Sequence, residues 1–140
     1  MVTLFDTHQH LIYRDQLNYD WTRDLPLLAN DDFKIEDYKL LTQDLGIGAS
    51  LFMEADADNY HKETHFVQSL SNDHKNNIRG LIASIRPEKE EGFEEWLNET
   101  LEMKVVGFRR ILHVVPDDVS QTNTFRNNVR KIGNIGKTFD

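Results

Sequence analysis

The sequence predicts an α/β fold: a partial (β/α)8 TIM barrel that contains about the first four β/α units, with parallel strands. Two observations predict it. Apolar runs typical of buried strands alternate four times with segments of helical periodicity, and polar or charged residues follow each apolar run. Repeated strand–helix units with right-handed crossovers form a parallel sheet covered by helices. Four such units are half of an eight-unit barrel, whose usual length is roughly 250 residues.

The predicted strands are the short apolar runs. The first, Val2-Thr3-Leu4-Phe5, is expected to be buried and to end at His8 to His10, and the second, residues 48–53, ends at Glu54. The third spans residues 78–85 and the fourth runs from 104 to about 112, while residues 135–140 look like the approach to a fifth. We therefore expect residues 1–140 to form a single domain, the N-terminal half of a barrel truncated at its fifth strand.

Helical spacing of apolar residues predicts a helix after each of the four strands. Asp31 and Asp32 are the expected N-caps of the first helix, and Gly46 is placed to end it. Its apolar face is formed by Ile35, Tyr38, Leu41 and Leu45. The other helices are expected at residues 61–70, 93–101 and 125–132, and the last is expected to stop near Gly133.

A long connection separates the first strand from the first helix. Residues 13–32 have no sustained periodicity, and a connection of this length is usually a functional loop or lid. Its aromatic residues are Tyr13, Tyr19 and Trp21. They either line the mouth of a pocket or hold the loop in place, and the sequence favours neither role over the other.

A doubly wound sheet of the flavodoxin kind is the alternative fold. It would place a site for a nucleotide or flavin at a topological switch point. The matching glycine pattern here is Gly46-Ile47-Gly48, which lacks a third glycine and precedes a strand. A helix stop followed by a tight turn explains it better, so we expect no nucleotide site.

Composition excludes several classes of protein. The chain is 39% hydrophobic and 29% charged, as in globular domains, and it has no apolar stretch long enough to span a bilayer and no signal peptide. Its net charge of -8 argues against nucleic-acid binding, which needs basic residues. The lack of cysteine excludes disulfides and thiolate chemistry, and it is consistent with a cytoplasmic protein.

The pattern Asp6-Thr7-His8-Gln9-His10 predicts a site at the end of the first strand. Residues two apart on a strand project to the same face, so His8 and His10 can reach one ion or one substrate group. Neutral imidazole is the commonest ligand of catalytic metals. A histidine pair without a function, or a pH-sensitive surface pair, is the alternative for so short a pattern.

Polar residues also follow the other strands. Glu54, Asp56 and Asp58 follow the second, Ser84 and Arg86 the third, and Arg109, Arg110 and His113 the fourth. Ligands of parallel α/β folds bind at the carboxyl ends of the strands, so this repeated pattern favours a site there. Arg109 and Arg110 must point to opposite faces, and His113 shares the face of Arg109 if the strand stays extended. His61 and His65 are one helical turn apart, but they lack the metalloprotease glutamate, so we expect a solvated helix face.

Four segments together resemble the amidohydrolase superfamily. They are Asp6-Thr7-His8-Gln9-His10, Tyr19-Asp20-Trp21, Phe52-Met53-Glu54-Ala55-Asp56 and Val106-Gly107-Phe108-Arg109-Arg110-Ile111-Leu112-His113. Within it, they resemble the TIM-barrel metal-dependent hydrolases that include sugar lactonases such as L-fuconolactonase and L-rhamnonolactonase. The resemblance implies the N-terminal half of an amidohydrolase-type barrel that hydrolyses a small lactone, ester or amide with activated water.

The resemblance also implies roles for individual residues. His8 and His10 would bind a divalent metal, most often zinc, or the substrate itself, and members of this branch differ in metal use. Glu54, Arg109 and Trp21 would bind substrate, and Arg109 and His113 would act in catalysis. The expected partner is a small molecule like a sugar lactone, with no nucleic acid and no membrane. The alternative is a non-catalytic half-barrel that only binds a ligand or associates with itself through its open sheet edge.

Overall fold

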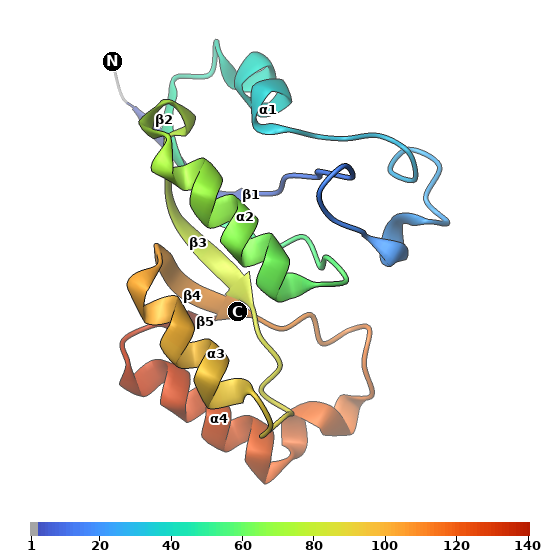
Figure 1. Ribbon diagram of the computed structural model, residues 1–140, viewed down its shortest axis with the longest axis vertical. Coiled ribbons are helices and arrows are strands. Elements are labelled where there is room, and N and C mark those ends of the chain that lie inside the picture. The colour runs from blue at the N-terminus through green and yellow to red at the C-terminus, as the bar shows by residue number, and fades with distance from the viewer. Residues whose placement is uncertain (1–2) are drawn as a thin grey trace.

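The computed structural model describes residues 3–140, which form a curled, five-stranded parallel sheet with the strand order β1-β2-β3-β4-β5 (Figure 1). The strands are β1 (Leu4–Gln9), β2 (Ile47–Met53), β3 (Ile78–Ser84), β4 (Val105–Arg109) and β5 (Thr138–Phe139). This order confirms the predicted partial barrel. A doubly wound sheet of the flavodoxin kind would place β1 inside the sheet, whereas here β1 lies at one edge.

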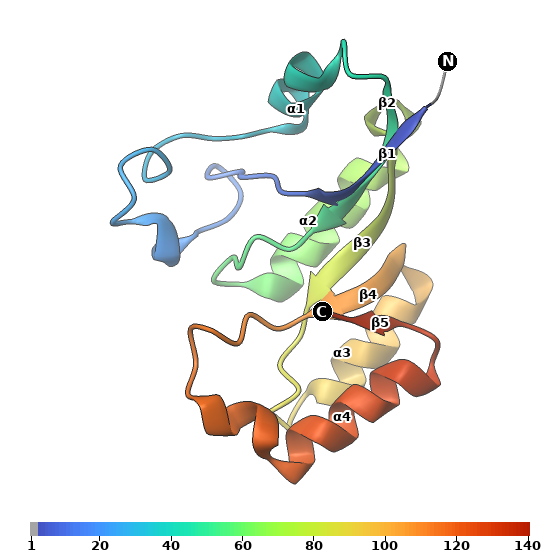
Figure 2. The ribbon, with the colours of Figure 1, turned by 180° about the vertical axis from the view of Figure 1, so that it is seen from behind.

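Three of the four helices cover one face of the sheet. The helices are α1 (Ile35–Thr42), α2 (Tyr60–Asn72), α3 (Phe93–Glu99) and α4 (Asn123–Asn134). Figure 1 shows α2 and α3 in front of the strands and α4 beside α3 at the bottom of the picture, and Figure 2 shows the strands from the opposite side. The core between the two layers includes Phe52, Leu81 and Phe108 from the strands, with Val67, Trp96 and Ile132 from the helices. Within the described residues, no helix is long and apolar enough to cross a membrane.

The first strand is less buried than its sequence predicts. Leu4 and Phe5 are 52% and 49% exposed. The reason is position, because β1 is an edge strand that pairs with β2 alone. The apolar run also predicted a strand at Val2, which lies outside the described residues.

The first helix begins and ends differently from the prediction. Asp31 and Asp32 do not cap it; the Asp32 carboxylate instead accepts a hydrogen bond from the Arg14 backbone N–H at 2.8 Å. The Asp37 carboxylate accepts the Lys34 N–H at 2.8 Å at the actual start of α1. Leu41 and Leu45 of the predicted apolar face are exposed, and only Ile35 of α1 is buried. Gly46 follows in a turn with a φ of 70°, which favours glycine.

The second helix confirms the prediction for residues 61–70 and extends it by one to two residues at each end. The Asn59 side chain caps α2 by accepting the Lys62 N–H at 2.9 Å. The expectation of a solvated helix face at His61 and His65 is confirmed, since both residues are exposed, although both also contact side chains of α3. The His61 ring stacks on Trp96 with a centroid distance of 4.0 Å, and His65 Nε2 lies 2.8 Å from the Glu99 carboxylate. These side chains therefore cover the outer side of the core tryptophan.

The fourth strand is shorter than predicted. β4 ends at Arg109 rather than near Leu112, because the chain then turns, with the Val115 N–H bonded to the Leu112 carbonyl at 3.2 Å. α4 begins two residues earlier than expected, and Thr122 Oγ1 caps it by accepting the Phe125 N–H at 3.1 Å. The predicted third helix is split into α3 and a short 3-10 turn, residues 100–102.

Trp96→Phe is expected to lower the free energy of unfolding by about 1–3 kcal/mol, because it leaves the buried Ser84 carbonyl without a donor. In the native chain, Trp96 Nε1 donates to that carbonyl at 3.1 Å. Urea denaturation followed by far-ultraviolet circular dichroism measures the change. Leu101→Ala is the control and is expected to have a small effect, since Leu101 is 45% exposed. Equal losses in both variants would contradict the assignment of Trp96 to the core.

Candidate functional site

A cavity of about 460 Å³ opens beside the carboxyl ends of the strands. The polar side chains that line it are His10, Glu54, Asp56, Arg109 and His113, and apolar lining comes from Trp21, Leu28, Ile111, Val114 and others. These residues come from β4 and from the segments that follow β1, β2 and β4. Figure 2 shows the two long connections, residues 10–34 and 110–122, projecting on the same side of the sheet. Of the six residues that the sequence predicts for the site, five therefore line one cavity: His10, Trp21, Glu54, Arg109 and His113.

The sixth predicted residue, His8, lies beside this cavity. His8 Nε2 and His10 Nε2 are 3.0 Å apart, and His10 Nδ1 donates to the Met53 carbonyl at 3.0 Å. Because Nδ1 carries the proton, neutral His10 has its lone pair on Nε2, and His8 is the donor of the pair. Burial lowers the pKa of His10, and the charges of His8 and Arg109 lower it further, against the opposing effect of the Met53 bond. His10 is thereby held in the neutral form that binds metal ions.

The histidine pair fits part of a zinc site. Two nitrogen atoms bound to one tetrahedral zinc ion lie about 3.3 Å apart, and the two Nε2 atoms are 3.0 Å apart. The carbonyl of Met53 orients His10 in the way that backbone carbonyls orient metal-binding histidines. A catalytic zinc needs three protein ligands, and no group of three or more His, Cys, Asp or Glu side chains in residues 3–140 could hold a metal ion. The described residues therefore do not form a complete metal site.

Glu54 is a buried carboxyl group that faces Arg109. Its side chain is 1% exposed, and Oε1 lies 3.7 Å from Arg109 Nη1, too far for a hydrogen bond. Oε2 accepts the N–H of Asp56 at 2.9 Å. Burial raises the pKa of Glu54, while that hydrogen bond and the charges of Arg109 and Arg86 oppose the rise. One oxygen of Glu54 is therefore left facing Arg109, the only arginine or lysine among the described residues that line the cavity.

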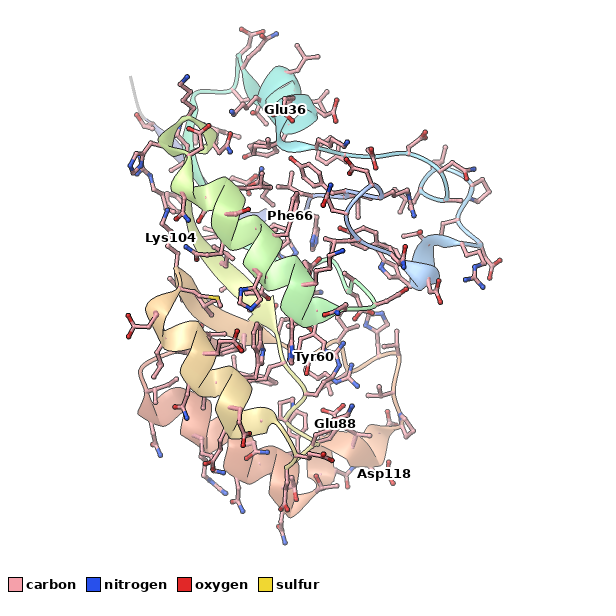
Figure 3. All side chains as sticks on the ribbon, in the orientation of Figure 1. Glu36, Tyr60, Phe66, Glu88, Lys104 and Asp118 are labelled. Atoms are coloured by element: carbon pink, nitrogen blue, oxygen red, sulfur yellow. The ribbon has the colours of Figure 1, made fainter. Side chains whose placement is uncertain are left out.

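The turn after β2 is fixed from several sides. Asp56 has a φ of 53°, the left-handed region, which is uncommon for residues other than glycine. Its carboxylate lies 3.3 Å from Arg86 Nη2, and the Arg86 guanidinium lies over the Tyr60 ring, 4.7 Å from its centroid. Figure 3 shows Tyr60 at the end of α2 that adjoins the connection between β3 and α3. This turn carries Glu54, so its geometry decides where that carboxyl group lies.

The two adjacent arginines separate as strand geometry requires. Arg109 lies in the cavity, whereas Arg110 donates from Nε and Nη2 to Glu88 Oε1, at 3.0 and 2.7 Å. Glu88, labelled in Figure 3, belongs to the connection between β3 and α3. Arg109 also lies 3.6 Å from the Asp140 carboxylate. Its guanidinium is thus set between two carboxyl groups at the edge of the cavity.

His113 reaches the cavity by a route that strand parity does not predict. β4 ends at Arg109, so the assumption of an extended strand fails, and His113 is an exposed residue of the following turn. This residue comes from a loop, which gives it more freedom than Arg109 has.

The aromatic residues of the long connection divide between the two predicted roles. Tyr13 and Tyr19 are buried and hold the loop, and the Tyr13 hydroxyl accepts the Ile35 N–H at 3.0 Å. Tyr13 also packs against Phe66 of α2, which Figure 3 shows on the side of the helix facing this connection. Trp21 lines the cavity, and its Nε1 donates to the Ala55 carbonyl at 2.9 Å.

Glu63 is a buried acidic residue near the site, and its burial was not predicted from the sequence. It lies on α2, is 0% exposed, and Oε1 accepts the Ala55 N–H at 3.0 Å. A signal was present, since Glu63, Phe66, Val67 and Leu70 have the spacing of one helix face. An acidic residue on an apolar face indicates a buried carboxyl group.

Comparison with known proteins identifies the fold. No protein-family model matches the chain, and no curated protein is significantly similar to it. An amidohydrolase from Burkholderia multivorans, crystallised with bound zinc, superimposes with a TM-score of 0.82 at 23% identity, over 99% of this chain and 48% of that one. A probable 2-pyrone-4,6-dicarboxylic acid hydrolase from Acinetobacter baumannii, with citric acid bound, gives 0.70 at 14% identity, over 99% and 48%. Amidohydrolase 2 from Bifidobacterium longum subsp. infantis gives 0.71 at 18% identity, over 99% and 51%.

These neighbours define the architecture of the chain. It has the fold of part of an amidohydrolase barrel, and it spans about half the length of the solved structures it matches. The resemblance noted in the sequence therefore holds at the level of the fold. A shared fold at this level of identity does not define the activity, the substrate or the metal of this chain.

Arg109→Met is expected to lower the free energy of unfolding by about 1–3 kcal/mol at pH 8, because it leaves the buried Glu54 carboxylate without a cation. The loss should be smaller at pH 5. The pKa of Glu54 is raised in the folded state, so its neutral form, which does not need Arg109, gains population as the pH falls. Urea denaturation at the two pH values measures the difference. Adding Glu54→Gln should restore most of the stability at pH 8, and a loss that is independent of both pH and Glu54 would contradict the pairing.

Proposed function

We propose that this chain is part of a hydrolase of the amidohydrolase superfamily that cleaves a small lactone, ester or amide with activated water, and that the substrate resembles a sugar lactone. The observation that carries the proposal is the shared cavity at the carboxyl ends of the strands, where His10, Arg109 and His113 lie together. Parallel α/β barrels carry their active sites at this end. The amidohydrolase fold of the solved neighbours, one with zinc bound, supports the same reaction class.

The proposed metal ligands are His8 and His10, and zinc is the expected ion. A divalent metal bound there supplies Lewis acidity toward the carbonyl oxygen of a substrate. The chain's own contribution is to keep His10 neutral and oriented, through burial and through the hydrogen bond from Nδ1 to Met53. If no metal binds, the same two imidazoles contact the substrate directly.

Arg109 and His113 carry the remaining chemistry in this proposal. The Arg109 guanidinium lies at the edge of the cavity and can donate hydrogen bonds to an oxyanion that develops on the substrate carbonyl. His113 lies in the turn after β4 and can move a proton between water and the leaving alkoxide. Glu54 orients Arg109, and the indole of Trp21 provides an apolar wall for the substrate ring.

Replacement of His8 or His10 by Ala is expected to reduce turnover about 10²-fold or more, the usual contribution of a positioned acid–base or metal-activating group. The assay uses the protein in the longest form that its gene encodes, with Zn²⁺ supplied. It measures hydrolysis of a panel of lactones, esters and amides. Thermal midpoints should change little for the exposed His8. His61→Ala is the matched control: it should lower the thermal midpoint, because His61 stacks on Trp96, while leaving turnover unchanged. Normal turnover by the His8 and His10 variants would refute the proposed site.

Self-association without catalysis is the second candidate function. Both edges of the described sheet, β1 and β5, lack a neighbouring strand, and Leu4, Phe5 and Val106 of the sheet are 52%, 49% and 40% exposed. Unpaired strand edges and exposed apolar side chains both favour association.

Light scattering coupled to size exclusion is therefore expected to show this chain as a dimer or larger species. Phe5→Lys should shift the distribution toward the monomer, because it puts a charge on the exposed edge strand. Glu99→Lys, at an exposed site far from β1, is the charge-matched control and should leave the size unchanged. A monodisperse monomer with a sharp two-state melt would rule out association.

A further inference from the structure

We propose that Glu63 is a positioning residue of the cavity: its buried carboxyl group holds the turn after β2 and, through the Ala55 peptide, fixes Trp21 in the cavity wall. The inference concerns the site of the proposed hydrolase and rests on that function only for its effect on turnover. The contacts that carry it lie entirely within the described residues.

The backbone of Ala55 is held through both of its polar groups. Its N–H donates to Glu63 Oε1 at 3.0 Å, and the carbonyl of the same residue accepts from Trp21 Nε1 at 2.9 Å. Ala55 itself is buried, and Trp21 is 45% exposed. The indole of Trp21 therefore depends on the Ala55 carbonyl for its orientation, and that carbonyl depends on α2 through Glu63.

The remaining oxygen of Glu63 indicates that a carboxyl group has a role here beyond accepting one hydrogen bond. Oε2 is fully buried and has no hydrogen-bond partner among the described residues. A glutamine would satisfy the Ala55 N–H equally well and would avoid the cost of burying an ionisable group. A carboxyl group, in contrast, makes the hold on the turn depend on protonation.

The surroundings of Glu63 determine when it ionises. Burial raises the pKa of Glu63 to about 8, and the nearby carboxylates Glu54 and Asp56 contribute in the same direction, against the charge of Arg86. Tyr19 of the long connection also faces it. Below this pKa the group is neutral and the acidic turn carries one charge fewer. Above it, a third carboxylate adjoins Glu54 and Asp56 and repels both.

The test uses the two tryptophans of the chain, Trp21 and Trp96, as separate reporters. Protein labelled with 5-fluorotryptophan gives one fluorine resonance for each, and Trp21→Phe assigns them. In Glu63→Ala at pH 6, the Trp21 resonance is expected to move toward the position of a solvated indole while that of Trp96 stays in place. Glu63→Gln keeps an acceptor for Ala55 and is expected to restore the native Trp21 resonance.

A pH series provides the second measurement and decides the question if Glu63→Ala does not fold. Between pH 6 and 9.5 the native Trp21 resonance is expected to shift with a midpoint near 8, and the shift should be absent in Glu63→Gln. Glu99→Gln, at an exposed carboxylate, is the control and should titrate like the native chain. A Trp21 resonance that is fixed across this range, or that shifts equally in Glu63→Gln, overturns the proposal.

The experiment is independent of the hydrolase assignment because it needs no substrate. A native pH response in a chain that hydrolyses nothing would uphold the role of Glu63 and refute the proposed activity. A fixed Trp21 resonance in an active enzyme would refute the role of Glu63 and uphold the proposed activity.

Discussion

The parallel direction of the five strands is the constraint on which the site depends. Because every strand points the same way, the segments that follow β1, β2 and β4 all begin at one edge of the sheet. This arrangement brings residues that are far apart in the chain to one cavity, among them His10, Glu54 and Arg109. Helices α2, α3 and α4 instead pack against the sheet and share its apolar core, and none of them lines the cavity.

The turn after β2 links this edge to the helical layer. Its backbone donates to two buried carboxyl groups: the N–H of Ala55 to Glu63 and that of Asp56 to Glu54. Both carboxyls have pKa values raised mainly by burial. Such groups are costly to bury as ions, and a raised pKa reduces that cost by favouring the neutral form. Both carboxyl groups also hold hydrogen-bond acceptors in fixed positions beside the turn, and Glu54 does so next to the guanidinium of Arg109.

Sequence patterns predicted the order of the elements, and the polar residues that follow the strands pointed to the edge of the sheet where the cavity lies, because both follow from local signals. The mainly apolar composition of residues 47–53 and 78–84 marks β2 and β3 well, since buried parallel strands have few polar residues. The same reasoning failed at β1, where Leu4 and Phe5 have the composition of a buried strand but lie at an open edge. Composition reports the environment a residue prefers, whereas exposure depends on the neighbours it has.

Failures at the site have a similar cause. The parity argument separated Arg109 from Arg110 but did not say which one faces the cavity, and it could not apply to His113, which lies in a turn closed by the hydrogen bond from the Val115 N–H to the Leu112 carbonyl. The N-caps expected at Asp31 and Asp32 were lost because Arg14, 18 residues before Asp32, competes for that carboxylate. The error at His113 comes from a local turn, whereas the error at the caps arises where a contact between distant residues overrides a local preference. Glu63 was missed because its contact lies outside its own helix. Its place on an apolar helix face can be read from the sequence, but its bond to Ala55 depends on how α2 packs over the end of β2. Residues such as Glu63, which contact the turn beside the cavity without lining it, are therefore identified only from the folded structure.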